Sequence, residues 1–383
     1  MDKQKVILLC NNPSITCLSV FKSLRKEKVP VEVILNNLEG PFIYSKFAKY
    51  KHNNENDPEK YLNFILNQCK KKDDPILWPI SDDTVKFISK NKTILEEKYV
   101  VPVPKWEIIQ KCVNKNKTYE EAKKIGVPTP ITYKVSTLDQ IEEISRKIKF
   151  PCIIKPDSTE IKKRIGKVVK IIDNKFELST TLTEFITKEW IPLNVQEIIP
   201  GPSSNLYTVG SVMDYNLKPS AIFTGRKIRQ KPIDFGTCTL GESKWTPEIA
   251  DLGIKLLKKI GYFGVSQVEF KFDPRDRTYK LMEINARPWL WIWLPTFCGM
   301  NLPYIFYKTI KDQESTVGKF EEGLYWHRVQ SDIVLLSQQI INPHPWFSFK
   351  DTLKYMFKRK TYPLFSIYDI KPFLYETYRL FFK

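Results

Sequence analysis

The chain has 383 residues, of which 42% are hydrophobic, 13% aromatic and 27% charged. This composition predicts a packed globular chain of roughly two or three domains and argues against a disordered one. Only three histidines occur, His52, His327 and His344, and their wide separation argues against a multi-histidine zinc or iron site. The seven cysteines include no CxxC pair, which is typical of reduced thiols in a cytosol.

The net charge of +18 arises from 61 basic and 43 acidic residues. Most of the basic residues are lysines spread along the whole chain, so we expect solvated lysine-rich faces and no nucleic-acid partner. An anionic substrate or a membrane surface is the alternative. No apolar run approaches ~20 residues, and the charged start leads into a strand-like segment. We therefore expect a cytoplasmic protein without a transmembrane helix or signal peptide.

The N-terminal part alternates apolar runs with helical stretches. Strands are predicted at 5–10, 31–35 and 76–83, and helices near 16–28 and 84–97. A βαβ opening of this kind places the loop Asn11–Thr16 at the carboxyl end of a strand, where ligands tend to bind. There is no GxGxxG sequence, so a dinucleotide fingerprint is not expected.

The central part reads as one helical stretch followed by several strands. The helical stretch covers 107–125 and stops at GVPTP. Strands are predicted at 150–156, 166–172 and 194–202 and in the runs LYTVGSVMD and SAIFTGRKI, and an amphipathic helix at 247–260 ends at Gly261. The run GVSQVEFKFDPRDRTYKLMEIN then predicts two alternating strands joined by a DPRD turn.

Two carboxylates and an amide come together in this last hairpin. Glu269 lies in QVEFKF, and Glu283 and Asn285 lie in LMEIN. Strand alternation puts Glu283, Asn285 and Arg287 on one face, with Glu269 across the hairpin. Such hard oxygen ligands suit Mg²⁺, which keeps waters and phosphate oxygens in its remaining positions. Each residue alone is more often a solvated strand position, but two acidic groups on one buried face need a cation.

Two lysines and a strand end predict a nucleotide site beside this hairpin. Lys155 finishes the apolar run CIIK, so its ammonium would project from a rigid strand, and Lys115 precedes Gly126 in a helical unit. The segment Gln196-Glu197-Ile198-Ile199 offers a carboxylate for an adenine amino group and backbone groups for the edge of its ring. Either lysine alone is more often a surface residue in so lysine-rich a chain. The order and spacing of the whole set therefore carries the interpretation.

This set resembles the ATP-grasp superfamily of carboxylate–amine or carboxylate–thiol ligases, from about Lys115 to Trp289. The matching segments are NKNKTYEEAKKIGVPTP for the first lysine helix, FPCIIKP for the second lysine strand, VQEIIPG for the adenine hinge and QVEF…MEINAR for the metal hairpin. The resemblance implies an α/β (α+β) ATP-grasp fold with a Rossmann-like N-terminal domain. It divides the chain into that domain at 1–106, a small lobe at 107–190, a large lobe with the metal site at 191–310 and a C-terminal extension at 311–383.

The resemblance also implies roles for the site residues. ATP would be bound by Lys115, Lys155, Gln196, Glu197, Ile198 and Ile199, and Mg²⁺ or Mn²⁺ by Glu269, Glu283 and Asn285. Arg287 would stabilise the charged transfer intermediate. The substrates would be a small carboxylate and an amine, and homodimers are common in the family.

A closer resemblance links FTGRKIRQKPIDFGTCTLGES and MEINARPWLW to a prokaryotic subgroup related to D-aspartate ligases and the large subunit of carbamoyl-phosphate synthase. In such enzymes a catalytic cluster like Arg226, Lys227 and Arg229 faces the phosphates or the substrate carboxylate. A short basic strand beside a metal site is suited to hold an acyl phosphate. For any single member, a solvated basic strand is an equally strong interpretation.

The loop after Lys155 departs from the family pattern. It reads PDSTEIKKRIGK and contains only Gly166, whereas the family covers the phosphates with a glycine-rich loop. Fewer glycines leave fewer backbone amides able to approach phosphates closely. Lys162, Lys163 and Arg164 offer side-chain charge instead, and the alternative is a degraded nucleotide site.

The C-terminal segment 341–383 carries eight basic residues, three acidic residues and thirteen aromatic residues. This pattern suits shallow contact with an anionic lipid surface or a lipid-linked substrate. Packing of the aromatic residues on the body of the protein is the interpretation we rank first.

The resemblance implies an ATP-dependent ligase that forms an amide through an acyl phosphate, and the subgroup resemblance alone suggests amino-acid or cell-wall peptide conjugation as the pathway. Asn11, Ser14, Ser81 and Asp82 are candidate substrate contacts. The alternatives are a bicarbonate-activating enzyme like carbamoyl-phosphate synthase and a weakly catalytic nucleotide-binding scaffold at a membrane.

Overall fold

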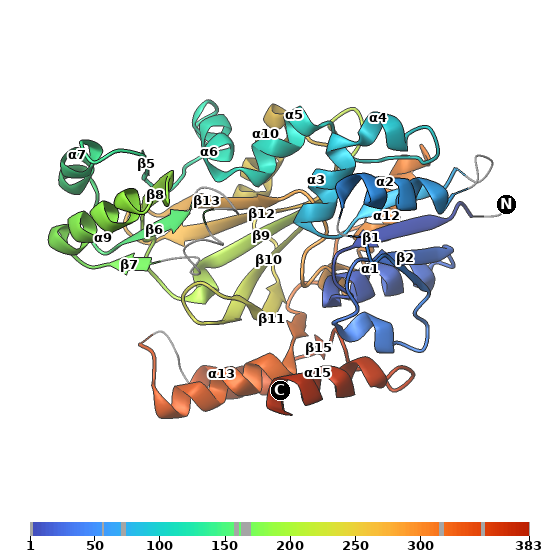
Figure 1. Cartoon of the computed structure of the whole chain (residues 1–383). Helices are drawn as coiled ribbons and strands as arrows, with labels where there is room; N and C mark the ends of the chain where they lie inside the picture. Colours follow the sequence, from blue (N-terminus) through green and yellow to red (C-terminus); the bar gives the residue numbers. More distant parts are fainter. Residues whose placement is uncertain are drawn as a thin grey trace.

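A computed structural model of the chain describes residues 3–55, 57–69, 74–156, 161, 170–313, 318–345 and 349–382. Three β-sheets organise this part of the chain, and helices pack around them (Figure 1). The N-terminal sheet and the largest sheet share buried cores, whereas the third sheet has a core of its own. The predicted combination of parallel and antiparallel sheets is confirmed.

The N-terminal sheet is parallel and has the strand order β3-β2-β1-β4. Its strands are β1 (Val6–Cys10), β2 (Val31–Leu35), β3 (Tyr50–His52) and β4 (Ile76–Pro79). The strands β1, β2 and β4 confirm the predicted apolar runs, and only the short β3 was not predicted. Helices α1 (Ile15–Lys26) and α3 (Asp82–Lys90) begin shortly after strands β1 and β4 end. Their first residues are preceded by Ser14 and Ser81, whose side chains accept hydrogen bonds from backbone amides in the first turn of each helix. Both helix N-termini therefore lie at the carboxyl edge of this sheet.

The small sheet is antiparallel and has the order β5-β8-β6-β7. Its strands are β5 (Thr132–Val135), β6 (Cys152–Pro156), β7 (Lys170–Ile172) and β8 (Leu193–Glu197), covered by helices α7 (Gln140–Lys147) and α9 (Lys175–Thr187). The hairpin predicted between the two apolar runs is present as β6 and β7. The predicted boundary at 190 is wrong in one respect, because β8 hydrogen-bonds to β5 and β6 and so belongs to this small sheet.

The largest sheet has the order β13-β12-β9-β10-β11-β14-β15. Its strands are β9 (Leu206–Met213), β10 (Pro219–Lys231), β11 (Thr237–Ser243), β12 (Gly264–Asp273), β13 (Thr278–Asn285), β14 (Tyr325–His327) and β15 (Lys360–Thr361). Helix α10 (Pro247–Ile260) ends, as predicted, at Gly261, which adopts a left-handed conformation with φ of +81°. Because β14 and β15 extend this sheet, the segment after 311 is an integral part of the large unit.

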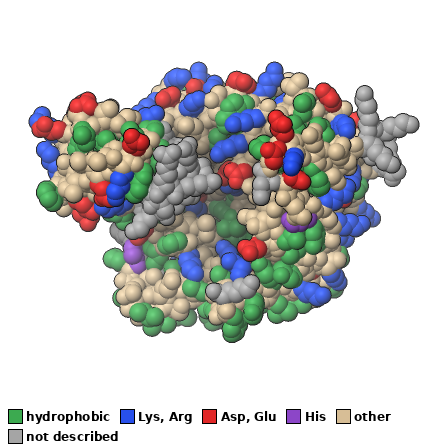
Figure 2. Space-filling model, viewed as in Figure 1, with side chains coloured by type: hydrophobic (Ala, Val, Ile, Leu, Met, Phe, Trp, Pro, Cys, Tyr) green, Lys and Arg blue, Asp and Glu red, His purple; other side chains and the backbone are tan. Residues whose placement is uncertain are grey.

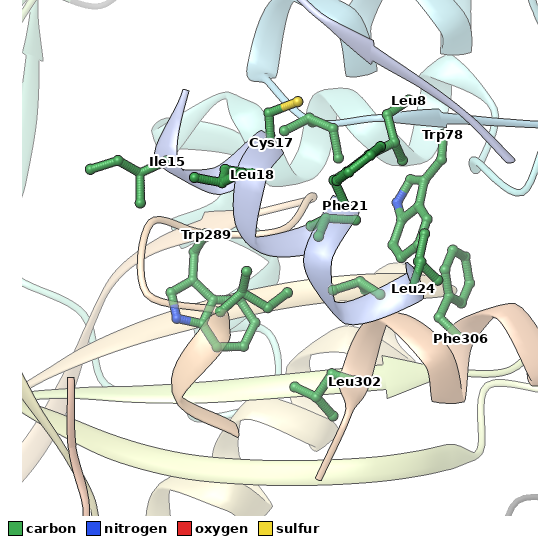
Figure 3. Close-up of a cluster of buried hydrophobic side chains, with 14 of the residues drawn as sticks. Leu8, Ile15, Cys17, Leu18, Phe21, Leu24, Trp78, Trp289, Leu302 and Phe306 are labelled. Atoms are coloured by element: carbon green, nitrogen blue, oxygen red, sulfur yellow. The ribbon is translucent and has the colours of Figure 1, made fainter. Parts of the chain in front are cut away.

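One buried core joins the N-terminal sheet to the largest sheet (Figure 3). Side chains of α1 and β4, such as Phe21 and Trp78, lie in the same cluster as Trp289, Leu302 and Phe306. A second cluster unites the other face of the N-terminal sheet with helices α5 (Trp106–Val113), α6 (Lys115–Lys123) and α10. The N-terminal unit is therefore fixed against the large sheet.

The remaining helices pack around the three sheets. They are α2 (Pro58–Asn67), α4 (Lys92–Leu95), α11 (Trp293–Phe297), α12 (Leu302–Ile310), α13 (Val329–Ile341), α14 (Phe349–Met356) and α15 (Lys371–Phe382), with 3₁₀ turns η1 (Pro41–Tyr44) and η2 (Ser203–Asn205). Helices α13 and α15 lie along the lower edge of the molecule in Figure 1. Within the described ranges, the helices are all too short or too polar to cross a bilayer.

Candidate active site

A cavity of about 600 Å³ lies between the small sheet and the largest sheet. The surface of the molecule is hollowed near the middle of the face seen in Figure 2. The walls of the cavity come from β6, β8, β9, β10, β11, β12 and β13, seven strands that the sequence distributes over more than a hundred residues. All of the predicted catalytic, ATP-binding and metal-binding residues line this cavity except Arg226 and Arg229.

The predicted metal-binding residues face one another across the hairpin of β12 and β13. Glu269 lies directly opposite Glu283, and Gln267 lies opposite Asn285. The Asn285 amide donates to Gln267 Oε1 at 3.0 Å and to Glu283 Oε1 at 3.3 Å. Alternation along both strands therefore brings three hard-oxygen side chains to one face, as predicted. Gln267 was missed, although its position two residues before Glu269 already indicated it.

Two lysines offset the charge of these carboxylates. The Lys227 ammonium forms an ion pair with Glu269, and Lys115 Nζ lies 3.2 Å from Glu283 Oε2. The positive charge of Lys115 lowers the pKa of Glu283 to about 2, although burial opposes this shift. Burial raises the pKa of Glu269 despite the nearby Lys227 ammonium. Glu283 is thus ionised at neutral pH. The pKa of Glu269, by contrast, stays above its ordinary value, because the charge of Lys227 does not fully offset the effect of burial.

Lys155 is the cation of the site that is least stabilised. Its ammonium donates to Gln196 Oε1 at 2.8 Å. Burial, with a further contribution from the charge of Lys115, lowers the pKa of Lys155 to about 7, although Glu283 acts in the opposite direction. A phosphate placed here would restore the charged form, because an anion favours the ammonium.

The structure gives Glu197 a role other than the predicted contact with an adenine amino group. Its Oε1 accepts the Ile131 amide at 2.9 Å, and its Oε2 accepts Arg275 Nη2 at 2.8 Å. Arg275 lies in the turn between β12 and β13, so this carboxylate ties the small sheet to the hairpin. These contacts hold the Glu197 carboxylate. In the segment 196–199, the backbone of 197–199 remains the part suited to contact the edge of an adenine ring.

The predicted cluster of Arg226, Lys227 and Arg229 is not one surface. Arg226 pairs with Glu242, and Arg229 is buried in a pair with Asp332 of α13. Only Lys227 reaches the cavity. Neighbours on a strand point to opposite faces, and the extra residue Ile228 interrupts the pairing of β10 with β11, which breaks the alternation beyond it.

A second cavity of about 590 Å³ adjoins the first. The two share Lys115, Glu283, Asn285 and Arg287 as lining residues. The candidate substrate contacts of the N-terminal unit all line this second cavity: Asn11, Ser14, Ser81 and Asp82. The row of shared residues thus separates a space beside the small sheet from a space beside the N-terminal sheet.

Arg287 connects these two spaces. Its Nε and Nη2 atoms donate to Asp82 Oδ1 at 2.8 Å and Asp82 Oδ2 at 2.9 Å, and Nη2 also donates to Asn285 Oδ1 at 3.0 Å. A bidentate pair of this kind fixes the guanidinium plane. Asp82 begins α3, so the N-terminal unit orients an arginine that follows the hairpin strand β13 by two residues.

Aromatic side chains close the first cavity on the side of the largest sheet. Trp289 and Trp291 follow β13, are buried, and line the cavity. Trp289 packs on Gly210 of β9, where an added Cβ would lie 2.2 Å from its ring. The sequence shows these tryptophans only as an aromatic cluster, because their glycine partner lies in a distant strand.

The loop predicted to cover the phosphates, with Lys162, Lys163, Arg164 and Gly166, lies outside the described residues. Within the described ranges, no group of three or more His, Cys, Asp or Glu side chains forms a metal cluster. The candidate metal position therefore has two carboxylates supplemented by an amide.

Comparisons with known proteins agree with this arrangement. No protein-family model matches the chain. D-aspartate ligase of Enterococcus faecium is 25% identical over 285 residues, covering 72% of this chain and 64% of the relative. A carbamoyl phosphate synthase large chain of Xylella fastidiosa is 29% identical over 203 residues, covering 50% of this chain. The chain spans less than two thirds of the first relative and 18% of the second.

Solved structures share the fold at lower identity. An L-amino acid ligase from Bacillus licheniformis has a TM-score of 0.64 at 15% identity and covers 85% of this chain and 79% of its own. The biotin carboxylase domain of a Hydrogenobacter thermophilus 2-oxoglutarate carboxylase, solved with MgADP, ADP and bicarbonate, has a TM-score of 0.64 at 16% identity, covering 85% and 74%. With its three sheets arranged in this way, the chain has the ATP-grasp fold of these solved structures.

Proposed function

We propose that the protein is an ATP-dependent ligase that joins a carboxylate to an amine through an acyl phosphate. The observation that carries this proposal is the convergence of Lys115, Lys155, Glu269 and Glu283 on one cavity, with a second cavity behind Glu283. Phosphoryl transfer needs positioning and charge neutralisation rather than a protein nucleophile. The site supplies cations for phosphates and carboxylates for a metal side by side.

The nucleotide fits the first cavity, between the small sheet and the hairpin. Lys155 and Lys115 would pair with its phosphates, and the backbone at 197–199 would face the base. The related biotin carboxylase domain is described with MgADP, which supports this assignment.

The donor set fits a divalent ion. Glu269 and Glu283 are opposed on paired strands, and burial raises the pKa of Glu269, so added positive charge is favourable there. Glu269, Glu283 and Asn285 would hold Mg²⁺ or Mn²⁺, which prefer oxygen ligands and retain waters and phosphate oxygens. When bound, the metal would neutralise charge on the transferring phosphoryl group.

The substrates fit the second cavity, beside the N-terminal sheet. A substrate carboxylate oxygen attacks the γ-phosphorus, ADP leaves, and an acyl phosphate forms. The amine then attacks the acyl carbon, phosphate leaves, the amine loses a proton, and an amide remains. Arg287 lies between the two cavities and would stabilise the negative charge in both steps.

The resemblance to D-aspartate ligase and L-amino acid ligase supports an amino acid or peptide as substrate. The second cavity contains both signs of charge, since Asp82, Asp83 and Lys86 line it together with Arg287. A zwitterionic amino acid complements such a lining, because its ammonium and its carboxylate each find an opposite charge. Cell-wall precursor peptides are a subset of this class.

The proposal is tested by measuring phosphate release from MgATP with a panel of amino acids, dipeptides, cell-wall precursor peptides and bicarbonate. We expect release only with an acid and amine pair, formation of the corresponding amide by mass spectrometry, and loss of both in Glu283→Gln. Glu142→Gln on the outer helix α7 is the matched control and should retain full turnover. Release with bicarbonate alone would favour the bicarbonate-activating alternative, and nucleotide binding without release would favour the scaffold.

A further inference from the structure

Exposed apolar side chains are concentrated at the C-terminal end of the described chain. Phe357 is 90% exposed, Ile341 77%, Ile367 76% and Phe382 74%. Figure 2 shows hydrophobic side chains along the lower edge of the molecule, where Figure 1 places α13 and α15. Scattered exposed apolar residues are normal, but a concentration of this kind marks an interaction surface. We call the exposed side chains of 340–382 the C-terminal face.

Helical spacing organises this face. On α15, Leu374, Tyr378 and Phe382 recur every four residues, and each is at least half exposed. Leu353 and Phe357 are also four residues apart, in the last turn of α14 and just after it, and Met356 is exposed beside them. An amphipathic helix ordinarily turns such a stripe inward.

The inward side of α15 already has its own contacts. Glu376 is buried in ion pairs with Arg328 and Arg379, and Phe373 packs against the core shared by the N-terminal and largest sheets. Tyr375 stacks on Tyr44 of η1 at a centroid distance of 4.2 Å. One side of α15 therefore packs on the protein, while the stripe of Leu374, Tyr378 and Phe382 faces solvent.

The segment that carries this apolar stripe is rich in basic residues. The segment 341–383 has eight basic residues and three acidic residues. Two of the acids do not reach the surface, because Asp369 accepts hydrogen bonds from Ser45 and the Lys46 amide, and Glu376 is buried. Exposed lysines at 350, 354, 358 and 371 remain at the surface. The face combines apolar side chains with net positive charge.

We propose that the C-terminal face docks on the surface of an anionic lipid bilayer. Helices with aromatic and aliphatic residues on one side and lysines beside them insert shallowly at the headgroup level, and anionic lipids attract the lysines. A second copy of the chain would bring like charges together, so the charge favours lipid over self-association. The inference is independent of the ligase activity, since it concerns a surface away from both cavities' lining residues.

The test is sedimentation of the full chain with vesicles, read as the bound fraction. We expect binding to phosphatidylcholine vesicles that contain phosphatidylglycerol, weak binding to pure phosphatidylcholine, and release as salt is raised. Replacing Phe357 and Leu374 together by serine should weaken binding at least about tenfold, because both side chains lose apolar area that enters the bilayer.

Matched variants separate this outcome from general effects. Phe176→Ser removes an aromatic side chain that is 82% exposed on α9, and we expect it to leave binding unchanged. Lys354→Glu should weaken binding to the anionic vesicles, whereas Lys175→Glu on α9 should not. Equal binding by the double variant and the parent, or binding insensitive to both lipid charge and salt, would overturn the proposal. A dimer seen by sedimentation velocity would also overturn the proposal, if the parent does not bind vesicles and the double variant is monomeric. The face would then be an interface between two copies of the chain.

Discussion

Lys155 is the lysine of the site whose pKa burial brings close to neutral pH. A pKa of about 7 means that its ammonium is present below that pH and lost above it, whereas an ordinary lysine stays charged to about pH 10. We therefore expect MgADP affinity to be constant at acidic pH and to fall as the pH rises above about 7, by up to about tenfold per unit. Nucleotide binding above pH 7 should take up a proton.

Isothermal titration calorimetry in two buffers of different ionisation enthalpy measures both the affinity for MgADP and the number of protons taken up on binding. The variant Lys155→Arg keeps its charge throughout this range and should flatten the affinity profile and abolish proton uptake. An unchanged pH profile in Lys155→Arg would show that another group is responsible.

Asp82 pairs with Arg287, and we predict that it contributes to turnover by holding this arginine in place. Since it fixes the guanidinium from another unit of the fold, Asp82→Asn should reduce turnover by about ten- to a hundredfold while MgADP affinity stays unchanged. Steady-state kinetics beside a nucleotide titration separates these effects. Asp251→Asn on the outer surface of α10 is the control. Equal losses of turnover and nucleotide affinity would contradict a positioning role.

At the level of elements, close approach of β9 to the segment after β13 forms the aromatic wall of the cavity. Gly210 permits this approach, because a Cβ there would overlap the Trp289 ring. We expect Gly210→Ala to lower the free energy of unfolding by about 1–3 kcal/mol, as overpacking of a filled core does. Urea denaturation followed by tryptophan fluorescence measures this change. Gly318→Ala, with open space around its Cβ, should be near neutral, and equal effects of the two would argue against overpacking.

On the scale of the whole molecule, the three sheets do not share one core. The N-terminal and largest sheets share buried clusters, whereas the small sheet is built on a cluster of its own. A unit joined to the rest by few buried contacts can open independently. The small sheet is thus the part of the molecule suited to move over a nucleotide.

Hydrogen exchange measured by mass spectrometry tests this inference. Amides of β6 and β8 should exchange faster than those of β1 and β9 in the free protein, and MgADP should protect β6 and β8 selectively. Lys155→Met should reduce this protection. Uniform protection of all three sheets by MgADP would show instead that they open as one unit.

The sequence by itself determined the local elements and most of the site. Apolar runs ending in Lys155 and carrying Glu269 and Glu283 indicate strands with chemistry at defined positions, because strand alternation is a local rule that survives in the folded chain. The order of lysines, hinge and hairpin predicted the fold through its resemblance to ATP-grasp ligases. Eleven of the thirteen predicted catalytic, ATP-binding and metal-binding residues line one cavity, and most of them lie on strands or directly after strand ends, whereas Lys115 lies on α6.

Only the tertiary structure decided which charges meet. Whether Arg229 faces a phosphate or Asp332 depends on the irregular pairing of β10 with β11, and whether Glu197 is available depends on Arg275 from a distant turn. The second cavity, the Asp82–Arg287 pair and the exposed stripe on α15 depend on how separate units pack. Ion pairs and cavities arise between residues far apart in the chain, so no local pattern encodes them, whereas helix and strand periodicity is set within a few neighbouring residues.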